Sequence, residues 1–325
     1  MRRRDIAATL FAALAACGGG EASAVDATTA IDANDDVGPR LGGFTIDLVA
    51  AFTASTGETT AAHTTVVGKI YDGVQPETVI WTAQATAGDC TLSVPSVPRC
   101  TTPCGATAAC VADETCQAYP SSHAVGDVEV TGVKTTAGAA AFTMSPIVNG
   151  YQPGAATVLA YPPFTAGDAV AMHATGSDFA PAFTLATHGI APLELAADPL
   201  ALASGQPLAL TWTAPADATA AVHVKLDISH HGGSKGKIEC DTADDGAVAI
   251  DASLVDALLA LGAAGYPTII VTRSATGHAA VATGHVDLVA ASTVERAVAV
   301  PGVTSCTDDT ECPSGQSCQP DLTCQ

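Results

Sequence analysis

Apolar and polar residues alternate along most of the chain after residue 43. In Val222–Ile228 every second residue is apolar, and Leu208, Leu210 and Trp212 repeat the pattern. Strict alternation puts apolar side chains on one face of an extended segment, as in a half-buried β-strand. Comparable runs, separated by turns rich in glycine, proline and aspartate, occupy residues 44–52, 65–71, 78–83, 127–134, 140–144, 168–174, 267–273, 285–290 and 295–300. Short, regularly spaced strands predict a mainly β protein built from antiparallel sandwiches.

The strands fall into two blocks. Pro192, Pro199 and Gly205 interrupt the pattern between residues 191 and 204. We therefore predict two antiparallel β-sandwich domains, residues 43–191 and 192–301. The second has the size of an immunoglobulin-like domain, and Trp212 is its expected core tryptophan.

One helix is expected in the second block. Leu254, Leu258 and Leu261 share a helical face. Ser253 followed by Asp256 forms an acidic capping box, and Gly262 supplies a stop. In a β-rich domain such a helix covers one end of the core.

Ten cysteines follow Cys17, an even number. They are Cys90, Cys100, Cys104, Cys110, Cys116, Cys240, Cys306, Cys312, Cys318 and Cys324. In an oxidising compartment this count predicts up to five disulfides, with a disulfide-rich insert at residues 90–116 and a disulfide-rich tail at residues 302–325. If the four tail cysteines pair among themselves and oxidation is complete, Cys240 must bond one cysteine of the insert. Zinc is the alternative, but only Cys100 and Cys104 have knuckle spacing.

The N-terminus has the layout of a secretory signal. Arg2, Arg3 and Arg4 precede an apolar stretch, Ile6–Ala16, that is too short to span a bilayer. The quartet from Leu14 to Cys17 resembles the bacterial lipobox. The resemblance implies cleavage after residue 16 and a triacylated, palmitate-type anchor on Cys17, and two or more acyl chains give stable attachment. The alternative is an ordinary secretory signal that is cut elsewhere.

Residues 17–42 are expected to form the lipid anchor and a flexible tether. The segment carries Glu21, Asp26, Asp32, Asp35 and Asp36, and it contains no basic residue before Arg40. Such a composition cannot offset the entropy of ordering. The whole chain has a formal net charge of −21, which disfavours nucleic acid and anionic headgroups as partners.

Two local patterns are candidates for metal binding. Asp241, Asp244 and Asp245 lie in a segment that mimics the opening of an EF loop, but Ala252 stands where the loop needs a glutamate. An acidic turn is the alternative to calcium binding there. His230 and His231 follow the strand 222–228, either as a transition-metal pair or as an ordinary hairpin turn.

For hydrolysis, the motifs G-x-S-x-G and H-E-x-x-H are missing from the sequence. The isolated histidines His173, His188, His278 and His285 leave a dispersed hydrolase site as a distant third hypothesis.

Three segments resemble cysteine-rich lipoproteins of myxobacteria and related Gram-negative bacteria, a group without an assigned activity. They are the insert Cys100–Cys116 with Tyr119-Pro120 and 126–130, the pair 205–213 with 238–241, and the tail Cys306–Cys324. The resemblance implies a β-rich fold and an outer-membrane location, on the periplasmic face or the cell surface. We expect a non-enzymatic envelope module without a cofactor, whose partner is an unidentified protein or glycan. The alternative is a binding protein for a glycan, a peptide or calcium.

Overall fold

The computed structural model describes residues 38–53, 59–196, 199–215 and 219–325. The expected signal peptide, Cys17 and most of the tether lie outside this part. Within residues 36–325 the chain forms one compact unit. No helix of the described residues has the length and apolar character needed to cross a bilayer.

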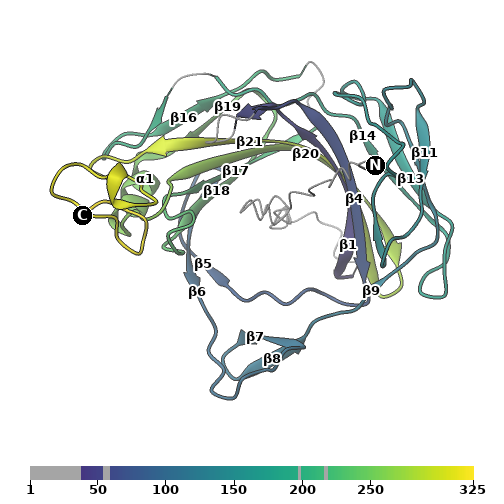
Figure 1. Ribbon diagram of the computed structural model, residues 1–325, viewed down its shortest axis with the longest axis horizontal. Coiled ribbons are helices and arrows are strands. Elements are labelled where there is room, and N and C mark those ends of the chain that lie inside the picture. Colours follow the sequence, from purple (N-terminus) through teal and green to yellow (C-terminus); the bar gives the residue numbers. More distant parts are fainter. Residues whose placement is uncertain (1–37, 54–58, 197–198, 216–218) are drawn as a thin grey trace, which may run out of the picture. The chain divides into compact units, whose positions relative to one another are not determined.

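A single large sheet dominates the described chain, as Figure 1 shows. Its strands are β1 (Arg40–Val49), β4 (His63–Tyr71), β5 (Ile80–Ala87), β6 (Cys90–Ser96), β9 (Ser122–His123), β12 (Gly150–Tyr151), β15 (Leu200–Ala201), β17 (Ala221–Asp227), β18 (Lys237–Ala243), β20 (Thr268–Val281) and β21 (Gly284–Ala299). The main path runs in the order β12-β4-β1-β21-β20-β17-β18-β6-β5. β9 pairs with β4 and β15 with β21 outside this path. The prediction of a mainly β, disulfide-rich protein is confirmed.

Smaller elements accompany this sheet. A four-stranded sheet contains β10 (Val128–Thr131), β11 (Ala141–Met144), β13 (Ala169–Ala174) and β14 (Phe183–His188). Three two-stranded sheets pair β16 (Leu208–Thr211) with β19 (Ala247–Ile250), β2 (Phe52–Thr53) with β3 (Thr59–Thr60), and β7 (Ala108–Ala112) with β8 (Thr115–Ala118). The helices are α1 (Ala252–Ala260) and a 3₁₀ turn, η1 (Asp309–Glu311).

The large sheet crosses the domain boundary expected at residue 191. Strands of both blocks belong to it, and β1 of the first block pairs in parallel with β21 of the second, although purely antiparallel pairing was expected. There are two hydrophobic cores, and both draw on residues from each side of that boundary. One contains Phe44 and Ile190 together with Leu288, and the other contains Leu92 together with Trp212.

Two long strands serve both cores. The start of β20 places Ile269 in the second core, and its later part places Val281 in the first. β21 runs the opposite way, with Val286 in the first core and Val298 in the second. The segments 285–290 and 295–300, expected as separate strands, are therefore one strand of 16 residues.

The helix forms where the leucine spacing predicts it, but its cap differs. Asp251, not Ser253, is the N-cap, and its carboxylate accepts a hydrogen bond from the Ser253 amide at 2.8 Å. Asp256 instead accepts hydrogen bonds from Ser204 Oγ and the Gly205 amide, each at 2.8 Å. The helix buries Leu254 and Leu258 in the second core, as expected.

Candidate functional site

The hairpin of β17 and β18 carries the densest set of paired charges in the large sheet. Its strands pair His223 with Asp241, Lys225 with Glu239, and Asp227 with Lys237. Each pair joins a basic residue to an acidic one on the same face, because directly opposed residues of an antiparallel pair share a face. The alternate residues of both strands, including Val224 and Cys240, are buried in the second core.

Four of these residues form a continuous chain of contacts, which we call the charged ladder: Lys237, Glu239, His223 and Asp241. Lys237 Nζ lies 2.7 Å from Glu239 Oε1, and its side chain is only 3% exposed. His223 Nε2 lies 3.8 Å from the same carboxylate oxygen, and its Nδ1 lies 2.8 Å from Asp241 Oδ1. The buried ammonium group of Lys237 therefore has the Glu239 carboxylate beside it, which limits the cost of burying the two charges.

An aromatic ring closes the buried end of the ladder. Lys237 Nζ lies 4.3 Å from the centre of the Trp81 ring, within the range of a cation–π contact. Trp81 belongs to β5, and Ser93 of β6 stands between the two strands in register with Lys237. The ladder and the ring thus extend from β17 and β18 across β6 to β5 on one face of the sheet.

Asp244, a predicted calcium ligand, has a different role. It is fully buried and binds Arg273 through both carboxylate oxygens, Nε–Oδ2 at 2.6 Å and Nη2–Oδ1 at 3.0 Å. Trp212 Nε1 donates to the same carboxylate at 2.7 Å. Asp241 binds His223, and Asp245 caps the backbone of its own turn. The calcium hypothesis is therefore wrong in grouping these three carboxylates, since each points to a different partner.

Arg273 fixes the segment between the two cores. Its guanidinium donates to the carbonyl oxygens of Ala191, Pro192 and Thr213 at 2.7–3.2 Å, besides binding Asp244. The side chain is 1% exposed. All three guanidinium nitrogens of Arg273 thus donate hydrogen bonds. These bonds connect β20 to Ala191 and Pro192, between the residues that enter the two cores.

The ten cysteines form five disulfides. Cys90 bonds Cys240 across adjacent strands β6 and β18, which confirms the expected link between the insert and the distant cysteine. The other pairs are Cys100–Cys110, Cys104–Cys116, Cys306–Cys318 and Cys312–Cys324. The tail cysteines pair among themselves, as predicted.

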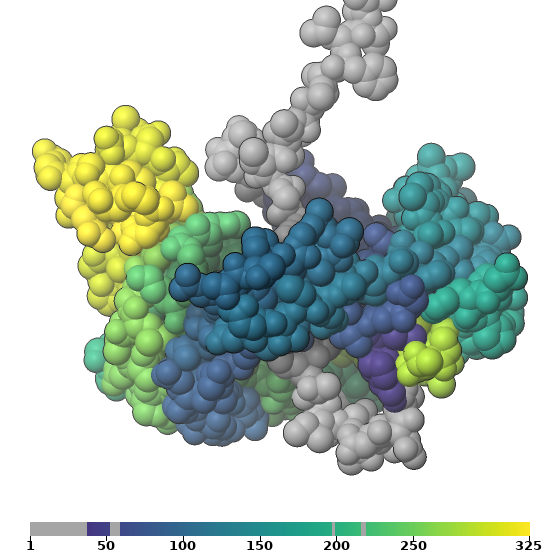
Figure 2. Space-filling view, turned by 90° about the horizontal axis from the view of Figure 1, so that it is seen from below, coloured from purple at the N-terminus to yellow at the C-terminus, as the bar shows by residue number. Residues whose placement is uncertain are grey.

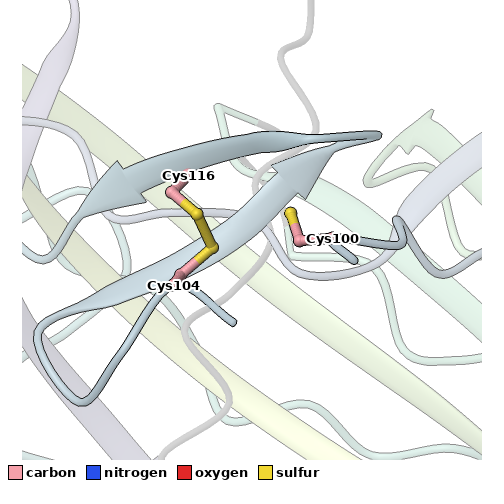
Figure 3. Close-up of side chains that lie close together, drawn as sticks. All are labelled: Cys100, Cys104 and Cys116. Atoms are coloured by element: carbon pink, nitrogen blue, oxygen red, sulfur yellow. A yellow bond between two sulfur atoms is a disulfide. The ribbon is translucent and has the colours of Figure 1, made fainter. Parts of the chain in front are cut away.

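Figure 3 shows the sulfur atoms that zinc would need. Those of Cys100, Cys104 and Cys116 lie within 4.8 Å of one another. Cys104 is bonded to Cys116, and Cys100 is bonded to Cys110. Thiolates are the metal ligands, so these oxidised sulfurs cannot hold zinc.

The two adjacent histidines lie in the loop between β17 and β18. The rings of His230 and His231 are 4.0 Å apart between centroids. Burial, and secondarily the neighbouring His231, lower the pKa of His230. The amide of Tyr266 donates to the His230 carbonyl at 2.8 Å, which fastens this loop to the segment that follows α1. The loop is therefore a packed hairpin connection.

The isolated histidines do not form one site. His173 and His188 lie on β13 and β14 and contact Thr184 and Thr219. The rings of His278 and His285 are 5.9 Å apart near the turn between β20 and β21. His173 and His188 lie in the four-stranded sheet, whereas His278 and His285 lie in the large sheet. Within the described chain, no contact between the two pairs supports a shared hydrolase site.

One carboxyl group on β1 has a strongly shifted pKa. Burial raises the pKa of Asp47 from 3.8 to about 6. The register places Asp47 opposite Thr65 of β4 and Ala291 of β21. Since neither neighbour carries a charge, nothing in the register offsets the desolvation of the carboxylate.

Two hollows occur in the described surface. One of about 50 Å³ lies between Leu195, Leu200 and the strand containing Leu210. A shallow one of about 520 Å³ lies at Arg99 and Cys104 of the insert, which Figure 2 shows in blue at the front of the molecule. Pockets for small organic ligands are enclosed and typically hold ~300–1,000 Å³. Neither hollow combines such a volume with enclosure.

No protein-family model matches the chain, and no curated protein matches it. The residues of the charged ladder were not predicted as a group. The sequence does contain a signal for them: when the hairpin 222–243 is folded on its loop, the polar residues of its two alternating runs fall opposite one another with opposite charge.

Proposed function

We propose that this protein is an exported, lipid-anchored, non-enzymatic module of the outer envelope that acts as a structural or surface-interaction element. The pairing of all ten cysteines after Cys17 supports this proposal most strongly. Five disulfides persist in oxidising compartments and are rare where glutathione and thioredoxin keep thiols reduced. The sequence from Arg2 to Cys17 supplies the matching export and lipidation signals.

The surface supports interaction through a sheet more than capture of a small molecule. Neither hollow is both ligand-sized and enclosed, whereas the charged ladder presents Asp241, whose side chain is 55% exposed, at the surface of the sheet. Matched charges fix the register and orientation of a macromolecular partner more than they add to affinity. The module is therefore expected to act through contact.

Mass spectrometry of the chain purified from an exporting Gram-negative host tests the proposal. We expect loss of residues 1–16, a diacylglyceryl and an acyl group on Cys17, and no titratable thiols. The variant Cys17→Ala should move from the membrane fraction to the soluble fraction. An unmodified Cys17 or a chain with reduced thiols would refute the proposal.

A binding protein for a glycan or peptide is the second candidate. Trp81 favours it, because an aromatic ring beside paired polar groups is a common feature of recognition surfaces. A glycan array probed with the purified chain and with Trp81→Ala distinguishes this candidate. Signals lost on removal of the indole would support it, and an array without signal would leave the structural role.

A further inference from the structure

The two edges of the large sheet are built differently. At one edge, β4 is covered by the short strands β9 and β12, each of two residues. At the other edge, β5 pairs only with β6 among the described residues. Figure 1 shows β4 and β5 on opposite sides of the large sheet. Proteins usually cover or charge a long edge, because its free N–H and C=O groups are a template for another strand.

In the described part of the chain, β5 lacks the charges, prolines and covering strands that usually protect an edge. Its eight residues, Ile80–Ala87, contain no charge and no proline, and six of them are exposed. Ile80 itself is 40% exposed. A register shift between Ala83 and Ala85 leaves Gln84 without a partner on β6, but pairing resumes beyond it. Among the described residues, no strand therefore covers the outer edge of β5 on either side of this irregularity.

Charges flank this edge. Glu77 precedes β5 and Asp89 follows it, and both are exposed. A second copy of the chain is a poor occupant. Antiparallel pairing of two β5 strands would set Glu77 near Asp89 of the copy, and parallel pairing would set like residues together. Both arrangements place like charges opposite each other, which is destabilising.

We propose that the free edge of β5 binds an extended peptide segment of a partner protein that has an uncharged centre and basic residues at both ends. The backbone of the segment would add a strand to the sheet, and its ends would meet Glu77 and Asp89. Strand addition of this kind takes its affinity from main-chain hydrogen bonds and its specificity from side chains. The net charge of −21 would also speed the encounter with a basic partner. This inference rests on the proposed role as an interaction module and names the class of its partner.

The probe is a capped ten-residue peptide of alternating threonine and valine with one lysine at each end. Two control peptides carry glutamate at the ends, or keep lysine but are N-methylated at alternate residues. We expect the lysine peptide to bind the oxidised chain at least tenfold more tightly than either control in fluorescence anisotropy. Hydrogen exchange should show new protection of the amides of Ile80–Ala87. Equal binding of all three peptides, or protection elsewhere, would overturn the inference.

Variants of β5 and its flanks distinguish the contribution of main-chain hydrogen bonds from that of the flanking charges. Gln84→Pro should abolish binding without breaking the β6 ladder, since Gln84 has no partner there, and Gln84→Ala should bind as the native chain does. The pair Glu77→Lys and Asp89→Lys should reverse the preference toward the glutamate peptide.

A matched pair controls for net charge. Glu129→Lys with Asp178→Lys changes two exposed acidic residues outside the β5–β6 hairpin and should leave the preference unchanged. Reversal by this control pair would refute the assignment to β5. The assignment would also be refuted if the unliganded chain sedimented as a dimer and Gln84→Pro converted that dimer to a monomer. If the peptides fail while Cys17 is lipidated, the inference is wrong and the proposed function stands.

Discussion

Replacing Arg273 with methionine removes the positive charge from the most buried ionic network of the described chain. Methionine keeps much of the length of the side chain, so the main loss is electrostatic. Asp244, which is 0% exposed, would keep its hydrogen bond from Trp212 but lose its counter-charge. Breaking one partner of such a buried pair costs about 3–5 kcal/mol, because an uncompensated charge stays inside the protein. Since domains are stable by roughly 5–15 kcal/mol, we expect a large fraction of the stability to disappear.

The double variant Arg273→Met with Asp244→Leu provides the sharper test. It removes both charges together and leaves the Trp212 indole N–H and the carbonyls of Ala191, Pro192 and Thr213 without their partners. An unpaired buried donor costs about 1–3 kcal/mol, and these carbonyls can be reached by water when the segment loosens. We therefore expect the double variant to be more stable than either single variant.

The assay is equilibrium unfolding in guanidinium chloride under oxidising conditions, with the free energy of unfolding extrapolated to water. Arg99→Met is the control, because Arg99 is exposed, and it should change stability by less than about 0.5 kcal/mol. If each single variant loses less than about 1 kcal/mol, or if the two losses simply add in the double variant, the network is not the coupled buried pair that the geometry implies.

Three further predictions concern the sheet. Asp47→Asn should stabilise the chain above pH 6 by up to about 3 kcal/mol. With the pKa of Asp47 raised from 3.8 to about 6, the folded native chain keeps the proton longer than the unfolded chain and loses stability as pH rises through that window. In urea melts the gain of the variant over the native chain should vanish below about pH 4, and a gain that does not depend on pH would refute the prediction. Cys90→Ala with Cys240→Ala should lower the free energy of unfolding by at most about 5 kcal/mol, from the 150-residue separation that this disulfide closes; equal stability of the variant and the oxidised native chain would contradict this. Gly277→Ala should cost roughly 1–3 kcal/mol in thermal unfolding, because a Cβ there meets the backbone carbonyl of Ala186 on β14, and an unchanged melting temperature would show that the two strands are less closely packed.

Most of the strands that the alternation predicted lie within a few residues of their expected bounds, but strands such as β6 and β14 were not predicted, and neither was the number of sheets. Periodicity reports which face of a strand is buried, and it is silent on which strand lies alongside. β1 shows the consequence, because its parallel partner β21 lies more than 200 residues away along the chain. Ile190 and Leu193, on either side of the expected boundary at residue 191, enter different cores, but Leu92 lies in the core of Leu193, and β20 and β21 pass from one core to the other.

Cysteine parity predicted one long-range contact that periodicity could not. With four tail cysteines paired locally, an odd number remained in the insert, so Cys240 needed a partner there. The structure pairs it with Cys90, directly opposite in register. Parity could not choose Cys90 among five candidates. The deciding fact is that β6 is a strand, which was not among the strands expected from the sequence.

The failure of the calcium hypothesis and the omission of the charged ladder both concern β18 and the point where it ends. In an extended chain, side chains lie on the same side of the backbone only at even spacing. Lys237, Glu239 and Asp241 have even spacing and share a face, which groups Asp241 with His223. Asp244 lies in the bend after β18 ends at Ala243 and is buried against Arg273. The strand period does not apply beyond Ala243, so only the tertiary fold determines the partner of Asp244.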